Sequence, residues 1–283
     1  MIDIVDQIWL ERVVRSALEE DLGAGDLTTD AIIVSGTKGK AALETREPII
    51  LAGLSVFHLV FTLLDSCITA QSHFSDGMRV SAGERICTIE GSLSAILKGE
   101  RTALNFIQRM SGIATLTRQY VDQVESLNVK VVDTRKTAPG LRLLDKYAVR
   151  MGGGFNHRMG LSDGILIKDN HIAIAGSIAK AVSLAKEKAP HTLKVEVEVE
   201  ELAGVEEAIG AGADSILLDN MSPNMIRKAV DLCRGRVLIE ASGGIKLENI
   251  REIAKTGVDI ISVGALTHSA PAVDLSLEVV SES

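Results

Sequence analysis

The sequence is poor in aromatic residues and proline, and it has no long apolar run. One Trp, two Tyr and five Phe leave Val, Ile, Leu and Ala to fill the core. Hydrophobic residues make up 46% of the chain against only five Pro, which argues against a disordered protein. No apolar stretch approaches the roughly 18 residues that span a bilayer, and the first residues do not resemble a signal peptide. We therefore expect a soluble, globular, cytoplasmic protein without a membrane partner.

Three further absences narrow the chemistry. Cys67, Cys87 and Cys233 are scattered, odd in number and without metal-ligand spacing, which is typical of core thiols in a reducing compartment. No GxGxxG or Walker motif occurs, which argues against dinucleotide and nucleoside triphosphate chemistry. The chain carries 30 basic and 38 acidic residues, a net charge of −8, so no nucleic-acid partner is expected.

One segment departs from this acidic balance. Residues 133–171 carry seven Lys or Arg against four Asp, hence a net charge of +3. The cations lie among Gly, Pro, Thr and Asn, which are residues of shaped loops. The pattern predicts a site for a small anion, with ion pairing to the local Asp residues as the alternative.

The first part of the chain mixes helices and strands without a repeating order. Apolar spacing predicts a helix over 3–20, and the Gly-, Asp- and Thr-rich residues 21–30 indicate a loop. Strand-like stretches follow near 40–46, 48–52, 67–74 and 85–90. A helical pattern runs from residue 92 to about 127, with Gly99 and Gly112 as candidate interruptions. This order favours an α+β domain with a sandwich-like sheet.

After residue 128, short apolar strands alternate with helical segments. Strands are predicted over 129–132, 164–167, 194–199, 214–218, 236–239 and 258–263, with helices around 140–150, 176–188, 201–210, 223–233 and 246–255. The alternation implies βαβ units and a parallel sheet. Polar residues follow five of the strands, which favours a (β/α) barrel with its site at one mouth over an open sheet with one switch point. We predict a barrel with fewer than eight strands.

The domain ranges follow from this change of pattern. We predict an N-terminal α+β domain over residues 1–111 and a catalytic α/β-barrel domain over residues 112–267. The tail alternates apolar residues from Val273 to Val279, which predicts a strand. Because no helix follows it, we expect residues 268–283 to return to the N-terminal sheet.

Charged residues after predicted strands are candidate ligands for an anion. Arg135 and Lys136 follow one strand, Lys168 follows the next, and Arg158 follows a triple glycine. Arg offers a planar fork that matches a carboxylate or phosphate, and Lys supplies a compact charge. Three more cations fall at helical spacing, and we expect them to face solvent or a partner subunit: Arg142, Lys146 and Arg150.

Glu198 and Asp219 are the acidic candidates. In the strand 194–199, Glu196, Glu198 and Glu200 share one face and the Val residues share the other. Asp219 ends the next strand, so its carboxylate and that of Glu198 can share a Mg²⁺, often through water. The alternative is a salt bridge to Lys168 or Lys136.

Two glycine-containing loops predict phosphate sites. The segments 241–245 and 262–269 each follow a strand and precede a predicted helix, the first helix starting near Lys246. Backbone N–H groups in such loops face an anion, and phosphate sites after the last two strands recur in barrels. The remaining histidines lack ligand spacing and are expected to be structural or exposed, among them His58, His73, His191 and His268.

Several long motifs occur together in one order. The motifs DTRKTAPGLR, GGGFNHRMGLSDGILIKDNH, VEVEVE, LLDN and EASGGI closely resemble the quinolinate phosphoribosyltransferases. The resemblance includes EEDLGAGDLTTD and GERTALNFIQRMSGIAT and so covers nearly the whole chain. It implies transfer from phosphoribosyl pyrophosphate to quinolinate (pyridine-2,3-dicarboxylate) with decarboxylation, giving nicotinate mononucleotide, pyrophosphate and CO₂ for NAD biosynthesis, with Mg²⁺ as cofactor.

The resemblance also implies residue roles. Lys136, Lys168, Glu198 and Asp219 would be catalytic, the two carboxylates also holding Mg²⁺. Arg101 would enter the active site of the partner subunit in a homodimer or a higher assembly of dimers. The implied substrate-binding set is Arg101, Thr134, Arg135, Lys136, His157, Arg158, Lys168, Glu198, Asp219, Ser242, Gly243, Gly244 and Gly264.

Three other functions stay open on the residues alone. The first is a barrel phosphoribosyltransferase that acts on a related base. The second is a Schiff-base aldolase with Lys168 or Lys136 as nucleophile. The third is an anion sensor on the same barrel, which a fold alone does not exclude.

Overall fold

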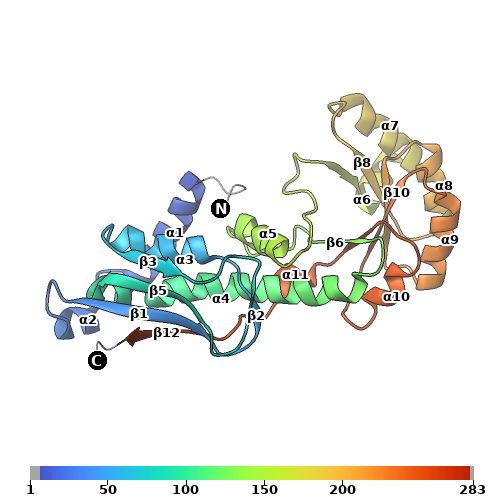
Figure 1. Ribbon diagram of the computed structural model, residues 1–283. Coiled ribbons are helices and arrows are strands. Elements are labelled where there is room, and N and C mark those ends of the chain that lie inside the picture. The colour runs from blue at the N-terminus through green and yellow to red at the C-terminus, as the bar shows by residue number, and fades with distance from the viewer. Residues whose placement is uncertain (1–6, 281–283) are drawn as a thin grey trace. The chain divides into compact units, whose positions relative to one another are not determined.

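The computed structural model describes residues 7–280, in two compact units (Figure 1). The first unit contains the chain up to Arg118, Ala138–Gly153 and the segment from Ala270 onward. The second contains Gln119–Thr137 and Gly154–Ser269. The ends of the predicted N-terminal domain, residues 1–6 and 281–283, lie outside the described residues. The domain ranges 1–111 and 112–267 stay a prediction.

The first unit is an α+β assembly around an antiparallel sheet. Its strands are β1 (Lys38–Thr45), β2 (Ile49–Ile50), β3 (Thr69–Ser72), β4 (Arg79–Val80), β5 (Arg85–Ser92) and β12 (Leu275–Val280). Its helices are α1 (Gln7–Leu22), α2 (Leu27–Ile32), α3 (Leu54–Leu64), α5 (Arg142–Met151) and most of α4 (Leu93–Val124). The main sheet has the order β12-β1-β5-β3, and β2 pairs with β4.

The C-terminal strand β12 closes one side of this sheet. It runs antiparallel to β1, from the pair Lys40–Val280 to the pair Thr45–Leu275. Leu275 and Leu277 are buried, as the apolar alternation of the tail predicts. The last strand within residues 7–280 therefore completes a sheet that begins near residue 38.

Helix α4 runs without interruption through both of its glycines. A Cβ at Gly112 would lie 2.0 Å from the carbonyl oxygen of Pro271, and one at Gly99 would lie 2.9 Å from the ring of Phe61. The two glycines therefore allow close packing against α4. The expectation that they interrupt the helix is wrong because this packing outweighs their low helix propensity, about 1 kcal/mol each.

The segment 21–30 holds the start of a helix as well as a loop. The Asp26 carboxylate accepts hydrogen bonds from the backbone nitrogens of Thr28 and Thr29, at 3.1 and 3.0 Å, and so caps α2. Asp is a strong N-cap residue because its oxygens satisfy the unpaired N–H groups of the first turn. The prediction of a loop throughout 21–30 is therefore wrong for α2.

The second unit contains six parallel strands. They are β6 (Lys130–Val132), β7 (Ile165–Ile167), β8 (Val195–Val199), β9 (Ser215–Asp219), β10 (Leu238–Ser242) and β11 (Ile260–Ser262). Its helices are α6 (Asp169–Ala175), α7 (Ile178–Lys188), α8 (Leu202–Gly210), α9 (Pro223–Cys233), α10 (Ile250–Ala254) and α11 (Ala265–His268). All six predicted strands are present, each within two residues of its predicted start.

The strand order is that of a barrel. The sheet reads β6-β11-β10-β9-β8-β7, so the last strand pairs with the first and the others follow in chain order. Beside β6, Phe155 forms a parallel bridge with Val132, on the side that leads round to β7. The (β/α) barrel with fewer than eight strands is confirmed, and residues 156–164 carry the chain from Phe155 to β7.

Helices cover the outside of the barrel. Helices α7, α8 and α9 lie side by side along the outer face of the strands (Figure 1). Burial alternates along β8, where Val195, Val197 and Val199 are buried and the intervening Glu residues are half-buried. The Val face packs into the core, so the Glu side chains point to the other face, as predicted.

Three local predictions need correction. Helix α10 starts at Ile250 instead of near Lys246, because residues 247–249 form turns. The short helices α6 and α11 were not predicted. Lys146 is only 1% exposed, so the expectation that it faces solvent is wrong. Among the helices of residues 7–280, none combines the length and the apolar character needed to cross a membrane.

Candidate active site

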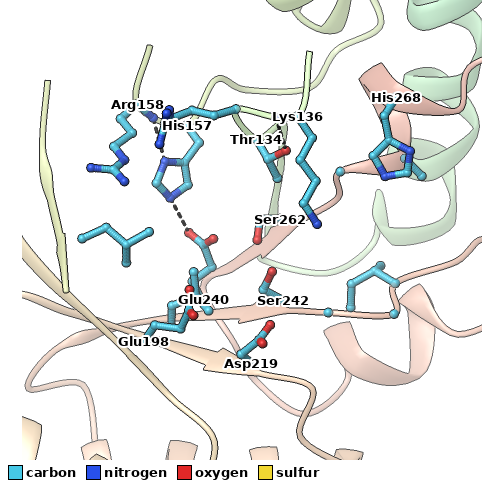
Figure 2. Close-up of a pocket in the computed structure, with 18 of the residues that line it drawn as sticks. Thr134, Lys136, His157, Arg158, Glu198, Asp219, Glu240, Ser242, Ser262 and His268 are labelled. Carbon is cyan, nitrogen blue, oxygen red and sulfur yellow. Dashed lines mark hydrogen bonds and ion pairs between the residues drawn. The ribbon is translucent and has the colours of Figure 1, made fainter. Parts of the chain in front are cut away.

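A cavity of about 680 Å³ lies in the second unit. The carboxyl ends of the parallel strands and the loops after them form its walls (Figure 2). It is lined by Tyr120, Thr134, Arg135, Lys136, His157, Arg158, Leu166, Lys168, Glu198, Leu217, Asp219, Glu240, Ser242, Gly243, Gly244, Ile245, Lys246, Ser262, Gly264, Ala265 and His268. A concave site at this end of a barrel is the usual location of chemistry in such folds.

The loop after β6 carries three predicted site residues. The Thr134 hydroxyl accepts a hydrogen bond from the Lys136 backbone nitrogen at 3.1 Å and so turns the chain. The Thr267 hydroxyl donates to the Lys136 carbonyl oxygen at 2.8 Å. Gly264 leaves room for the lysine stem, since a Cβ there would lie 3.1 Å from Lys136 Cδ. These contacts place Lys136 at the cavity (Figure 2).

A buried carboxylate holds the loop that carries His157 and Arg158. Asp133 is fully buried and accepts hydrogen bonds from Asn156 Nδ2 at 2.6 Å and from the His157 backbone nitrogen at 2.9 Å. Further along, the Arg158 guanidinium donates to the Gly164 carbonyl oxygen at 2.8 Å. The loop is thus tied at both ends, and its two basic side chains lie at the cavity (Figure 2).

Several charged side chains act on the Arg158 guanidinium. Burial lowers the pKa of its guanidinium, and the positive charge of Arg135 lowers it further. Glu196 and Asp163 act in the opposite direction. Two neighbouring guanidiniums repel each other unless an anion lies between them, which favours binding of a carboxylate or phosphate.

Lys168 and Glu198 form an ion pair within the cavity. Lys168 Nζ lies 2.5 Å from Glu198 Oε2, and the Glu198 side chain is only 17% exposed. The Lys168 backbone nitrogen also donates to His171 Nδ1 at 3.0 Å, at the start of α6. The salt bridge considered from sequence is therefore present, and it leaves one Glu198 oxygen for another partner.

Asp219 is held at the end of β9 by its neighbour. Asn220 adopts a left-handed backbone conformation, with φ of 54°, and its amide donates to Asp219 Oδ2 at 2.9 Å. The Asn220 backbone nitrogen donates to the Ser242 carbonyl oxygen at 3.0 Å. A Cβ at Gly243 would lie 2.2 Å from Asn220 Oδ1, so the loop after β10 needs glycine there.

His157 and Glu240 line the cavity and form a three-residue cluster with Glu196. His157 Nε2 lies 3.3 Å from Glu196 Oε2 and 3.5 Å from Glu240 Oε2. Burial raises the pKa of the Glu240 carboxyl to about 7, the charge of Glu196 raises it further, and His157 opposes the shift. Among residues 7–280, these three side chains have ligand atoms close enough together for a metal ion, all within 4.8 Å of one another.

The structure brings the predicted site residues together with one exception. All of them line the cavity apart from Arg101, which is an exposed residue of α4 in the first unit. The cavity also contains side chains that were not predicted as part of a site, among them Tyr120, Glu240 and Lys246. Ser262 and His268 fall within the predicted phosphate loop 262–269, although neither was named as a ligand there. The only sequence feature that points to Glu240 as a site residue is its position after an apolar run. His268 is exposed, as expected, but it lies at the cavity.

Comparison with known proteins assigns the chain to a family. The sequence model of the quinolinate phosphoribosyl transferase C-terminal domain matches residues 113–278, and that of the N-terminal domain matches residues 26–111. The chain belongs to the quinolinate phosphoribosyltransferase family. The resemblance noted in the motifs is confirmed.

Relatives from bacteria and plants match along almost the whole chain. A probable nicotinate-nucleotide pyrophosphorylase (carboxylating) of Bacillus subtilis is 44% identical over 97% of this chain and 95% of its own length. The quinolinate phosphoribosyltransferase (decarboxylating) 1b of Nicotiana tabacum is 40% identical over 96% of this chain and 83% of its own. The solved nicotinate-nucleotide pyrophosphorylase of Francisella tularensis is 46% identical, covers 99% of both chains and has a TM-score of 0.94.

Proposed function

We infer that the chain is a decarboxylating quinolinate phosphoribosyltransferase. It transfers the phosphoribosyl group of phosphoribosyl pyrophosphate to the ring nitrogen of quinolinate and releases pyrophosphate and CO₂. The product is nicotinate mononucleotide, an intermediate of NAD biosynthesis. The family match and the names of relatives at 40–44% identity support this activity.

One observation links this activity to the structure. A single cavity carries two Arg, three Lys and three carboxylate side chains, together with the glycine loops after β10 and β11. A dicarboxylate, a pyrophosphate and a 5′-phosphate are all anions, so a cationic cavity of this size matches both substrates.

The two arginines are suited to orient quinolinate. Arg135 and Arg158 can each bind one carboxylate of quinolinate through two parallel hydrogen bonds. These bonds fix the orientation of the pyridine ring. Once the ring nitrogen is bonded to ribose C1 it is cationic. The C2–carboxylate bond then breaks, its electron pair stays on C2 beside the cationic nitrogen, and C2 takes up a proton. The protein mainly needs to hold the ring in place.

The carboxylates and lysines face the charges of the transfer step. Departure of pyrophosphate from ribose C1 builds positive charge on the sugar, which Glu198 and Asp219 can stabilise. Lys136 and Lys168 supply positive charge for the leaving pyrophosphate. The Lys168 nitrogen lies 2.5 Å from the Glu198 carboxylate, and this ion pair occupies the atom that a Schiff-base aldolase would use as nucleophile, so that function is less favoured.

Glu198 and Asp219 would hold Mg²⁺, directly or through water. Two carboxylates on neighbouring strands offer the oxygen ligands that Mg²⁺ prefers, and one Glu198 oxygen is left by the pair with Lys168. When bound, Mg²⁺ neutralises charge on pyrophosphate. The backbone of Ser242, Gly243, Gly244 and Gly264 would bind the 5′-phosphate.

The assembly and location of the enzyme complete the proposal. We propose a homodimer, or an assembly of dimers, in which Arg101 enters the active site of the partner subunit. Arg101 is exposed, which leaves it available for that role. We further propose a cytoplasmic location, which agrees with free thiols at all three cysteines.

The activity is tested by incubating the protein with quinolinate, phosphoribosyl pyrophosphate and Mg²⁺. Nicotinate mononucleotide, pyrophosphate and CO₂ should form in equal amounts, and omission of any one component should stop the reaction. Nicotinate in place of quinolinate should give no product. Turnover of nicotinate with equal efficiency would instead support a phosphoribosyltransferase for a related base.

Substitution tests the pocket. Arg158→Ala should raise the KM for quinolinate by roughly ten- to a hundredfold, because it removes a charge-assisted fork worth about 1.5–3 kcal/mol. Arg227→Ala is the matched control, since Arg227 is exposed on α9 and its guanidinium donates to the Asn224 side-chain oxygen at 2.8 Å, away from the cavity-lining residues. Normal quinolinate affinity in Arg158→Ala would refute the placement.

A further inference from the structure

The cluster of His157, Glu196 and Glu240 shows which nitrogen of the imidazole carries the proton. The Arg158 backbone nitrogen donates a hydrogen bond to His157 Nδ1 at 2.7 Å. A nitrogen that accepts a hydrogen bond carries a lone pair, so the proton of a neutral ring resides on Nε2. Nε2 faces Glu240, as Figure 2 shows, and also faces Glu196. Both ring nitrogens therefore face partners within the protein.

This arrangement does not fit a metal ligand. A neutral histidine that binds a metal through Nε2 must carry its proton on Nδ1, where it usually donates to an acceptor. Here Nδ1 faces a donor, the Arg158 N–H. The three side chains lie at metal-like spacing, but the imidazole presents N–H instead of a lone pair to the two carboxylates.

The two carboxylates are anchored on separate strands. Glu196 lies on β8 and accepts a hydrogen bond from the Ser215 hydroxyl at 3.1 Å through its other oxygen. Glu240 lies on β10, with β9 between them, and is only 2% exposed. A buried side chain held by a barrel strand has little freedom, so the position of the imidazole is set by the barrel wall.

The imidazole in turn sets the position of Arg158. Its Nδ1 accepts from the Arg158 backbone, and the Arg158 side chain is fixed at its far end by the Gly164 carbonyl oxygen. The chain of contacts thus runs from Glu240 and Glu196 through His157 to the guanidinium that lines the cavity. Part of the guanidinium fork stays available for a ligand, because Arg has five N–H donors.

We propose that Glu196, His157 and Glu240 are positioning residues that orient Arg158 toward a carboxylate of the pyridine substrate. The Arg158 guanidinium then contacts that carboxylate. The inference rests on the proposed function only for the identity of the carboxylate ligand. The geometry of the cluster can be tested without turnover.

Nitrogen-15 NMR of the histidine ring tests the geometry first. The wild-type protein at pH 8 should show His157 as the Nε2–H form, assigned by loss of its signals in His157→Asn. Addition of Zn²⁺ at a few equivalents should leave these signals unchanged. An Nδ1–H form would overturn the proposal. So would stoichiometric Zn²⁺ binding that Glu240→Gln abolishes, since the three residues would then be metal ligands.

Binding and kinetics test the positioning role. Glu240→Gln keeps an acceptor but adds a donor that competes with the imidazole N–H, and Glu240→Ala removes the side chain. Both should raise the Kd and KM for quinolinate roughly ten- to a hundredfold, as expected for a misplaced binding group. The KM for phosphoribosyl pyrophosphate should stay within twofold of wild type in Glu240→Gln, with kcat changed less than KM.

One control variant and two distinct outcomes separate the positioning role from the proposed reaction. Glu187→Gln removes one acidic charge from the exposed surface of α7 and should behave as wild type. A kcat loss in the Glu240 variants with quinolinate affinity unchanged would overturn the positioning role. Absence of turnover in wild type, with the Nε2–H form and tight quinolinate binding both observed, would instead refute the proposed reaction and leave the cluster assignment intact.

Discussion

At the scale of single residues, the loop after β10 depends on the absence of a side chain at one position. Gly243 has φ of 86°, and a Cβ there would lie 2.2 Å from the Asn220 amide oxygen and 2.8 Å from the Asn220 backbone nitrogen. Asn220 in turn bonds to Asp219. An added methyl group therefore displaces either the loop or the residue that orients Asp219.

Gly243→Ala should therefore weaken phosphoribosyl pyrophosphate binding at least tenfold, measured as Kd by calorimetry and as KM. Gly235→Ala is a matched control, because Gly235 also has positive φ, at 72°, but no atom lies within 4 Å of its added Cβ. The control should lose only the roughly 1 kcal/mol of stability that a left-handed alanine costs. Equal behaviour of the two variants would contradict a role for the Asn220 contact.

Glu240 makes stability depend on pH. Its pKa is raised from 4.5 to about 7 in the folded protein, chiefly by burial. The folded state therefore holds this proton more tightly than the unfolded state does. The stabilisation is complete below pH 4.5 and is lost as pH rises to about 7, a change of roughly 3 kcal/mol.

Glu240→Gln should remove this dependence. The difference in free energy of unfolding between wild type and variant should change by up to about 3 kcal/mol between pH 5 and pH 8, in favour of the variant at pH 8. Urea unfolding at several pH values measures it. Glu187→Gln should run parallel to wild type, and a parallel curve for Glu240→Gln would show that the carboxyl has an ordinary pKa in the folded protein.

At the scale of elements, a buried ion pair connects two helices of the first unit. Arg109 on α4 donates to both carboxylate oxygens of Asp145 on α5, at 3.0 and 2.8 Å. Asp145 is fully buried and also accepts from the Ala138 backbone nitrogen at 3.0 Å. Removal of the cation leaves a buried carboxylate without its charge partner.

Arg109→Ala should therefore lower the free energy of unfolding by about 3 kcal/mol, measured by chemical denaturation. Arg15→Ala breaks the exposed pair with Glu11 on α1 and should cost less than about 0.5 kcal/mol. Arg109→Lys, which keeps the charge and loses the fork, should fall between them. A loss in Arg109→Ala as small as that in Arg15→Ala would show that Asp145 is well solvated.

The elements that sequence analysis predicted well share one property. Five of the six barrel strands are short, mainly apolar runs, as expected for a parallel sheet buried on both sides, and β8 alternates Val and Glu, which is also a strand pattern. The elements it missed depend on contacts that no periodicity records. Helix α2 forms because the Asp26 carboxylate caps it, and helix α11 has only four residues, too few for a helical period.

The candidate site shows the same limit. Arg135, Lys136, Lys168 and Asp219 were identifiable because they are charged residues directly after apolar strands. Glu240 also follows such a strand, but nothing in the sequence shows that its carboxyl packs beside His157. Ser262 and Tyr120 carry no charge that would mark them as site residues in the sequence. They reach the cavity because closure of the barrel brings distant segments of the chain together.

At the scale of the whole molecule, the proposed role of Arg101 makes the active site a property of the dimer. Arg101→Ala and Lys168→Ala should each abolish activity. In each active site, however, the two substitutions affect different subunits, because Lys168 comes from one subunit and Arg101 from its partner. Co-expression of the two variants should restore about a quarter of the wild-type activity, because half of the dimers are mixed and each mixed dimer has one intact site.

Differently tagged subunits allow the mixed dimers to be purified and assayed, with a co-expressed pair of Lys168→Ala subunits as control. Restoration in the mixed dimers alone supports a contribution from the partner subunit. No restoration would place Arg101 and Lys168 in the same subunit's site or assign Arg101 no catalytic part.

The pairing of β12 with β1 has a consequence for synthesis on the ribosome. The sheet that starts at Lys38 gains its last strand only with Leu275–Val280, after the whole second unit has been translated. The barrel strands lie between Lys130 and Ser262, so all of them emerge before β12 does. Domains generally fold in the order in which they are made. In this chain the order of completion is reversed: all strands of the barrel are available for pairing before β12, the strand that completes the N-terminal sheet, has been synthesised.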